Sequence, residues 1–436
     1  MMLRLLVFSL LFLLPVRVLA APADLPSRCF VCAAASEAAY SGELPELLRA
    51  RLAAAGWQIA SYETEGHRGT VGRFFHMVRT DEDGTETHLI AFPGTERGSD
   101  VWTDLRLGRA AFGGDSPAEF LAVRDMRVTE RSETPLVHRG FLDYTQAALF
   151  TDVLPAYGNR TAGEVLAAEL RAHPSMRIYL TGHSLGGAAA VLTAARLSDL
   201  GVAPEQLVVT TFGAPAVGNA AFVRRYEGRF TLHRVVMSGD PMKDVLAAPL
   251  GFQQFGERVP WSPARSVAKF PHAMMVYVDA AIRQLYDAYG GDNAFLFLMG
   301  LPNRTEGRTL YVLPIETELD DTLAEDAPYM TAVLRDALHV QNASVVFAAG
   351  GGGLSADGML SGLSSHLAAA RAAGAEQMVA YRIAGAKIRD ARETYRLTLE
   401  RVVYDRDGNL LAAGSRSART GALTPIETVL YLFAQD

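Results

Sequence analysis

Ser184 is the residue whose surroundings most favour chemistry. It stands in the run 182–186, which reads Gly-His-Ser-Leu-Gly. An apolar segment typical of a strand precedes this run, and an Ala-rich segment typical of a helix follows it. In such a strand-turn-helix the turn is so tight that glycines must flank the serine, whose hydroxyl is lifted above the sheet edge. A helix-capping serine is the alternative interpretation, but this context predicts a nucleophile. The backbone N–H of Leu185 would then lie at a helix N-terminus, where it can stabilise an oxyanion.

A serine nucleophile requires an acid to orient its base, and in this type of site the chain order is serine, acid, histidine. Asp240 directly follows an expected strand at 232–237 and is the predicted acid. It would emerge on the same side of the sheet as Ser184. Asp244, four residues further on, is the alternative acid.

The base must be a histidine that follows the acid in the chain. His272 lies at the expected start of a helix after a long loop and is the predicted base. The other later histidines, His339 and His366, fall in a second region of the chain. His272 alone therefore fits both the order and the region.

The elements around these residues alternate between strand and helix. Strands alternating with helices of this length predict a mostly parallel sheet that is covered on both faces, and hence an α/β fold. A helical segment over 21 to about 60 is expected before this unit. The expected strands are 70–79, 86–92, 176–181, 206–211 and 232–237, and the expected helices are 160–172, 220–225 and one that begins near 185.

A second unit, small and of α/β (α+β) type, is predicted over 306–436. Its expected elements are a strand at 309–314, a helix at 329–339, a strand at 344–348, a helix at 364–373 and a hairpin of 395–404 with 410–416. The linker is expected within 288–308, so that the first domain spans 21–288. No catalytic constellation occurs in the second unit, whose role and partner the sequence leaves open.

The composition and the first residues limit the class of protein. The chain has 436 residues, of which 49% are hydrophobic and 20% charged, and a formal net charge of −7. This composition argues against disorder, and the lack of clustered positive charge argues against a nucleic-acid partner. Arg4 followed by the apolar run 5–16 and a small-residue site near Ala20 is the layout of a signal peptide, expected over 1–20. We therefore expect export to the periplasm or the medium.

The sequence contains two cysteines, Cys29 and Cys32. Export permits a disulfide, and a small clip close to the mature N-terminus is the favoured interpretation. A redox motif would need a thioredoxin-like context, and a zinc site would need further ligands. Neither is evident, so no metal and no cofactor are expected.

Several segments in order resemble the class 3 lipases, the fungal-type triacylglycerol lipases of the α/β-hydrolase superfamily. The resemblance covers roughly residues 70–285, and it implies an α/β-hydrolase domain that cleaves carboxylic esters. It also implies a second oxyanion donor at Thr95, to act with Leu185, and a lid after Thr95. The matching segments are 90–95 (IAFPGT), 100–104 (DVWTD), 137–142 (VHRGFL), 182–187 (GHSLGG), 212–219 (FGAPAVGN), 240–241 (DP) and 272–277 (HAMMVY).

The chain departs from the family pattern at two places beside the expected pocket entrance. Pro93 replaces an arginine, and the segment 100–104 has one extra residue before Trp102. The leading prediction is an exported serine hydrolase of lipid or small esters that meets a membrane or lipid interface transiently. A phospholipase or thioesterase with the same triad is the alternative enzyme. A non-catalytic envelope binding or assembly protein is the alternative of another class.

Overall fold

The computed structural model describes most of the chain after residue 23. Predictions for the signal peptide 1–20, the lid after Thr95 with its segment 100–104, and the linker 290–308 lie outside the described residues. The described ranges are 24–66, 69–80, 84, 86–95, 108–126, 133–244, 250–268, 271–289, 309–342, 344–355, 358, 360–389 and 394–435.

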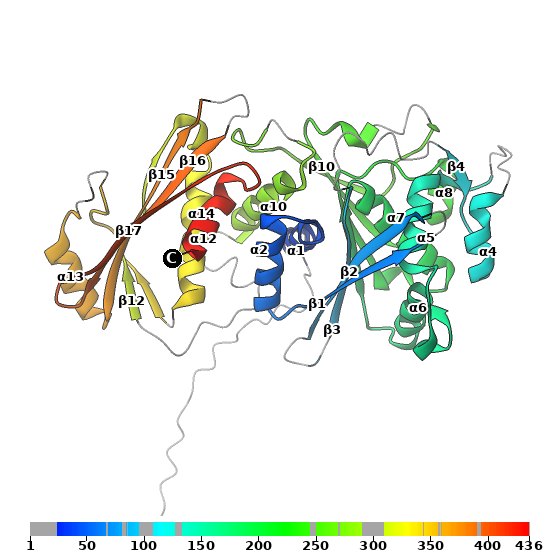
Figure 1. Ribbon diagram of the computed structural model, residues 1–436, viewed down its shortest axis with the longest axis horizontal. Helices are drawn as coiled ribbons and strands as arrows, with labels where there is room; N and C mark the ends of the chain where they lie inside the picture. Colours follow the sequence, from blue (N-terminus) through cyan, green and yellow to red (C-terminus); the bar gives the residue numbers. More distant parts are fainter. Residues whose placement is uncertain are drawn as a thin grey trace, which may run out of the picture.

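A seven-stranded, mostly parallel sheet forms the centre of the first domain (Figure 1). Its order is β1-β2-β3-β8-β9-β10-β11; β1 and β2 run antiparallel to their neighbours, and the other strands pair in parallel. Every residue of β8 and β9 is buried, so apolar residues occur at successive positions in both strands instead of alternating with polar ones. The strands are β1 (Gln58–Glu65), β2 (Val71–Thr80), β3 (Glu86–Phe92), β8 (Ile178–His183), β9 (Leu207–Phe212), β10 (Thr231–Met237) and β11 (Glu257–Trp261). Shorter strands are β4 (Arg109–Ala111), β5 (Leu136–His138), β6 (Val153–Leu154) and β7 (Arg160–Thr161).

Helices cover both faces of this sheet, as the alternating pattern predicts. The face toward the C-terminal unit carries α1 (Leu25–Ala38), α2 (Glu43–Ala54) and α10 (Met274–Tyr289). The other side carries α4 (Pro117–Ala122), α5 (Arg139–Leu149), α6 (Ala162–Ala172), α7 (Leu185–Asp199) and α8 (Ala220–Tyr226). The α/β class is confirmed. The helical expectation up to residue 60 is wrong at its end, because the alternating residues from Gln58 onward pair with β2 as strand β1.

The C-terminal unit is a second sheet, of order β14-β12-β15-β16-β17 with β13 beside β15. The expected strands and helices are present, but the prediction omitted β13, the long central strand β15 and the last helix, α14. The strands are β12 (Thr309–Val312), β13 (Glu316–Leu319), β14 (Ser344–Phe347), β15 (Gln377–Lys387), β16 (Tyr395–Asp405) and β17 (Leu410–Arg419). The helices are α12 (Ala327–Gln341), α13 (Leu363–Ala372) and α14 (Pro425–Ala434).

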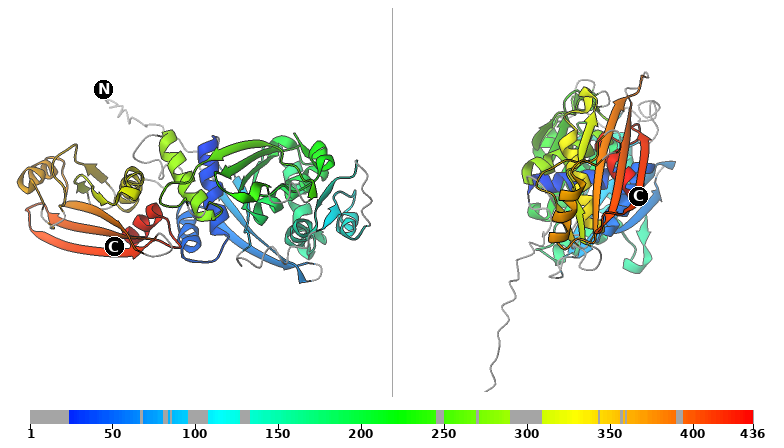
Figure 2. Two further views of the ribbon diagram at one scale, coloured as in Figure 1. Left: turned by 90° about the horizontal axis from the view of Figure 1, so that it is seen from above. Right: turned by 90° about the vertical axis from the view of Figure 1, so that its left-hand side faces the viewer.

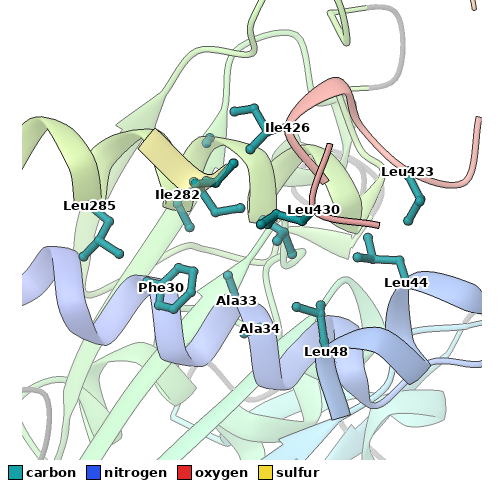
Figure 3. Packing of buried hydrophobic residues seen from close by; sticks show 14 of the residues in the cluster. Phe30, Ala33, Ala34, Leu44, Leu48, Ile282, Leu285, Leu423, Ile426 and Leu430 are labelled. Carbon is teal, nitrogen blue, oxygen red and sulfur yellow. The ribbon is translucent and has the colours of Figure 1, made fainter. Parts of the chain in front are cut away.

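One continuous apolar core joins the two units. The helices α1, α2, α10, α12 and α14 lie between the two sheets in Figure 1 and in the left view of Figure 2. Phe30 of α1, Leu285 of α10 and Leu430 of α14 belong to the same buried cluster (Figure 3), which extends from Leu89 in the first sheet to Leu397 in the second. Because the two sheets share this core, the C-terminal unit packs as a continuation of the first domain.

The two cysteines lie inside helix α1, which Asp24 caps by accepting a hydrogen bond from Ser27 N at 3.0 Å. Both cysteines are free thiols, and each is only 1% exposed. Burial raises the pKa of Cys29 to about 12 and that of Cys32 to about 11. The predicted disulfide clip is therefore wrong: the segment folds as a helix whose cysteines fill the apolar core against the sheet.

Candidate active site

The run around Ser184 forms a sharp turn between β8 and α7. Ser184 has φ 54° and ψ −120°, a conformation that non-glycine residues rarely adopt and that is typical of strained functional turns. Its N–H donates to the carbonyl of Phe212 at 3.0 Å, which fixes the turn to the neighbouring strand β9. A Cβ at Gly182 would lie 2.3 Å from the carbonyl carbon of Gly186, so the turn requires glycine there.

The structure brings Ser184, His272 and Asp240 together at the carboxyl edge of the sheet. His272 Nε2 lies 3.2 Å from Ser184 Oγ, and His272 Nδ1 lies 2.9 Å from Asp240 Oδ2. A carboxylate oxygen can only accept, so Nδ1 carries the proton of the neutral ring. The lone pair of Nε2 therefore faces the serine hydroxyl and is free to accept its proton.

Buried donors hold the Asp240 carboxylate in place. Asp240 is 2% exposed, and its Oδ2 accepts a further bond of 2.5 Å from the Tyr277 hydroxyl on α10. Met242 N donates to Oδ1 at 2.8 Å. Burial alone raises the pKa of Asp240, but the hydrogen bonds from His272, Tyr277 and Met242 and the charge of His272 together lower it below its ordinary value. The alternative acid, Asp244, ends the short helix η5 (Pro241–Asp244) that follows.

Two residues that were not predicted from the sequence support His272, the candidate base, through its backbone carbonyl. His183 Nε2 donates to the backbone carbonyl of His272 at 2.8 Å, and the Tyr40 hydroxyl donates to His183 Nδ1 at 2.7 Å. Burial, reinforced by the charge of His272, lowers the pKa of His183 to about 3, so the ring stays neutral. His183 lies inside the glycine-serine motif and could have been singled out. Tyr40 follows α1, 143 residues earlier, and nothing local in the sequence marks it.

The two predicted oxyanion donors come from segments that border the turn. Leu185 is the first residue of α7. Thr95 is exposed and follows Gly94, where a Cβ would lie 2.9 Å from the carbonyl oxygen of His183. The segment that ends at Thr95 therefore runs directly beside the turn, although the oxyanion role of both residues stays a prediction.

The described residues also bear on metal binding and on membrane spanning. Among these residues, no three or more His, Cys, Asp or Glu side chains gather in a way that could bind a metal ion. Within the same part of the chain, no helix is both long enough and apolar enough to span a bilayer.

Comparison with known proteins gives one family match and several partial relatives. Residues 89–248 match the model of the family "Lipase (class 3)". The toxin TseL of Vibrio cholerae is 37% identical over 91 residues, which are 21% of this chain and 12% of the toxin. A lipase of Caenorhabditis elegans is 34% identical over 134 residues (29% of this chain, 35% of that protein), and the lipase of Rhizomucor miehei is 33% identical over 127 residues (28% and 31%).

The chain thus spans about a third or less of the length of these relatives. Among solved structures, lipase II from Rhizopus niveus aligns with a TM-score of 0.37 and 20% identity, over 54% of this chain and 78% of that one. The matched residues 89–248 contain the Ser184 turn and Asp240, and they include both of the segments named above as oxyanion donors. Over residues 89–248, the chain is therefore similar to the class 3 lipases.

Proposed function

We propose that this protein is a serine hydrolase that cleaves carboxylic esters of lipids through an acyl-enzyme. The observation that carries the proposal is the continuous chain from Ser184 Oγ through His272 to Asp240, with spacings of 3.2 and 2.9 Å. A nucleophile, a base and an orienting acid within hydrogen-bond reach are the minimum for this chemistry. The match of residues 89–248 to the class 3 lipase family model supports the same reaction.

In the proposed reaction, Ser184 Oγ attacks the acyl carbon while His272 Nε2 takes the hydroxyl proton. The tetrahedral oxyanion is held by the N–H groups of Thr95 and Leu185, and each such donor contributes roughly 3 kcal/mol to transition-state stability. Asp240 stabilises the imidazolium, which then protonates the leaving alcohol. Water, activated by the same imidazole, hydrolyses the acyl-enzyme and restores the serine.

We also infer that the protein acts after export and meets its substrate at a lipid surface. The support is the signal-like order of residues 1–20, a basic residue followed by an apolar run and a small-residue site. Fractionation of the native host tests this inference. Activity in the periplasm or medium agrees with it, and activity confined to the cytosol contradicts it.

Hydrolysis of p-nitrophenyl esters tests the proposed reaction. We expect Ser184→Ala and His272→Ala to lower kcat by on the order of 10⁴-fold or more, because both act as one unit. Ser198→Ala is the matched control: this hydroxyl lies in the same helix α7, and among the described residues it bonds only to the Ala195 carbonyl. If Ser184→Ala hydrolyses the esters as fast as Ser198→Ala, the proposal fails.

The same assay separates the two candidate acids. Asp240→Asn should remove most of the activity because the wrong His272 tautomer would face Ser184. Asp244→Asn should leave activity close to wild type. A larger loss in Asp244→Asn would reverse the assignment. A panel of triglycerides, phospholipids and thioesters would then define the acyl donor.

A further inference from the structure

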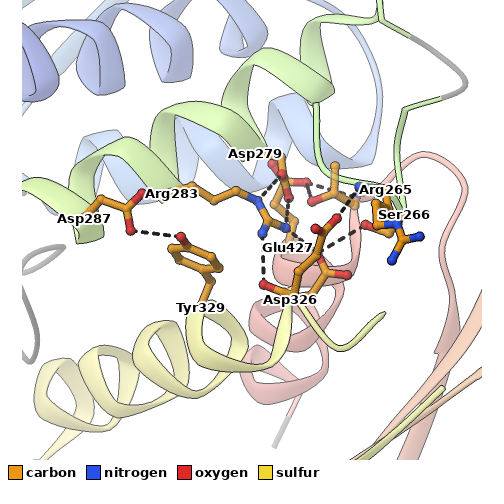
Figure 4. A network of polar contacts seen from close by, with 10 residues as sticks. Arg265, Ser266, Asp279, Arg283, Asp287, Asp326, Tyr329 and Glu427 are labelled. Carbon is orange, nitrogen blue, oxygen red and sulfur yellow. Dashed lines mark hydrogen bonds and ion pairs between the residues drawn. The ribbon is translucent and has the colours of Figure 1, made fainter. Parts of the chain in front are cut away.

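Two neighbouring residues of the C-terminal unit contact the chain on both sides of His272. Asp326, the residue before α12, accepts a hydrogen bond from Ser266 Oγ at 3.1 Å. Its Oδ1 also pairs with Arg283 on α10 (Figure 4). Ser266 lies six residues before His272, and α10 begins two residues after it. One carboxyl oxygen of the C-terminal unit therefore ties the loop before the histidine to the helix after it.

Glu325 reinforces the same connection. Its carboxylate accepts a hydrogen bond from Arg265 N, on the loop before His272. Its backbone carbonyl accepts from Arg283 Nη1 at 3.3 Å, on the helix after it. Glu325 and Asp326, the two residues before α12, thus bond to the segments on both sides of His272.

The ion pair of Asp326 with Arg283 is largely buried, which restricts its movement. Asp326 is fully buried, and Arg283 is held between it and Asp279, with 2.7 Å from Arg283 Nε to Asp279 Oδ2. The Arg283 guanidinium lies 4.6 Å from the centre of the Tyr329 ring on α12. A buried ion pair with additional hydrogen bonds has little freedom to shift, since breaking it would leave a charge unpaired.

The connection reaches the triad through helix α10. Tyr277 on the first turns of this helix donates to Asp240, and Arg283 lies further along the same helix. We propose that Asp326 is a positioning residue: the C-terminal unit clamps the His272 segment on both sides and so sets the distance from His272 Nε2 to Ser184 Oγ. This inference rests on the proposed ester hydrolysis, and it gives the C-terminal unit a role in that reaction.

The test compares full-length variants in p-nitrophenyl butyrate hydrolysis and in the rate of labelling by a fluorophosphonate. Asp326→Asn removes the charge with almost no change of shape, and Ser266→Ala removes one bond from the loop side. Because displacing a catalytic group by about 1 Å can cost on the order of 100-fold, we expect Asp326→Asn to lower kcat about tenfold or more, with KM changed less than about twofold. The labelling rate should fall by the same factor, and Ser266→Ala should show a smaller loss of the same kind.

Tyr329→Phe is the matched control. It removes the 2.9 Å hydrogen bond from the Tyr329 hydroxyl to Asp287, which joins the same two helices and leaves the bonds to the loop before His272 in place. All variants are compared at equal folded concentration, from circular dichroism. The proposed positioning role is contradicted if folded Asp326→Asn has the same kcat as Tyr329→Phe, or if Asp326→Asn changes KM alone. If Asp326→Asn does not fold, an unchanged kcat in Ser266→Ala overturns it. A wild-type protein that the probe does not label would instead refute the proposed hydrolysis itself.

Discussion

At the scale of single residues, the site contains two imidazoles with opposite tasks. The rings of His183 and His272 lie 4.6 Å apart, centre to centre. In the proposed reaction His272 accepts a proton, whereas burial keeps His183 neutral with a pKa of about 3. A second positive charge therefore does not form beside the imidazolium. His183 instead uses its one N–H to hold the His272 carbonyl, and Tyr40 fixes that tautomer.

Replacement of Tyr40 by phenylalanine tests this support. The change leaves His183 Nδ1 as a buried acceptor without the Tyr40 hydroxyl that donates to it, which should lower the free energy of unfolding by about 1–3 kcal/mol. The kcat for ester hydrolysis should also fall, because the His272 backbone is held less firmly. Urea denaturation and initial rates measure the two effects. Tyr62→Phe, at an exposed tyrosine of β1, is the control, and equal behaviour of the two variants would contradict the assignment.

At the scale of elements, close packing of α7 on the sheet positions the nucleophile. A Cβ at Gly186 would lie 2.1 Å from the carbonyl oxygen of Phe92, at the end of β3. A Cβ at Gly187 would lie 2.7 Å from the Cβ of Ala214. The helix can therefore approach the segment that ends at Thr95 only because these positions lack side chains.

Gly186→Ala should push α7 away from β3. We expect a loss of about 1–3 kcal/mol or more in the free energy of unfolding, together with a large loss of ester hydrolysis. Gly414→Ala is the control, because a Cβ on this residue of β17 would meet nothing within 4 Å. Chemical denaturation measures the stability of both variants, and the rate of ester hydrolysis measures their activity. A Gly186→Ala enzyme as stable and active as Gly414→Ala would show that the close approach is not required.

Local patterns allowed much of the hydrolase sheet to be predicted. The apolar runs of β8 and β9 and the glycines beside Ser184 express constraints that act within a few residues. The order serine, acid, histidine, together with the strand end before Asp240 and the region that contains His272, selected the residues that meet in space. Strand β15 escaped prediction because its sequence, QMVAYRIAGAK, mixes apolar, small and charged residues, and its place in the sheet depends on distant strands.

Non-local contacts account for the rest of what the sequence did not reveal. Asp279 and Arg283 have the spacing of an ordinary surface pair on a helix. They are buried because α12, from a distant part of the chain, packs against them. Tyr40 likewise depends on a distant partner, because its hydroxyl bonds to His183 far along the chain. Cys29 is buried because its helix packs on the sheet.

At the scale of the whole molecule, acidic side chains gather where the two units meet. Glu37 of α1 and Glu427 of α14 are both buried. Burial raises the pKa of Glu37 to about 7, and burial with the charges of Asp279 and Glu37 raises that of Glu427 to about 8. The junction therefore holds protonated carboxyls near neutral pH, and its stability depends on pH.

Glu427→Gln tests this dependence. Between pH 4.5 and about 8 the folded protein keeps a proton on Glu427 that the unfolded chain releases. The free energy of unfolding of the wild type should therefore fall as pH rises through this window, by up to about 1.4 kcal/mol per pH unit from this group, and level off above it. The variant lacks this contribution, so it should gain stability relative to wild type as pH rises. A stability difference that stays constant across the window would contradict the raised pKa.

The most direct test of the whole account is the identity of the residue that reacts with a fluorophosphonate. The full chain is treated with the probe and digested, and the modified peptide is sequenced by mass spectrometry. We predict one adduct, on Ser184, which disappears in Ser184→Ala and is strongly reduced in His272→Ala. Labelling of another residue, or equal labelling of Ser184→Ala and wild type, would contradict it.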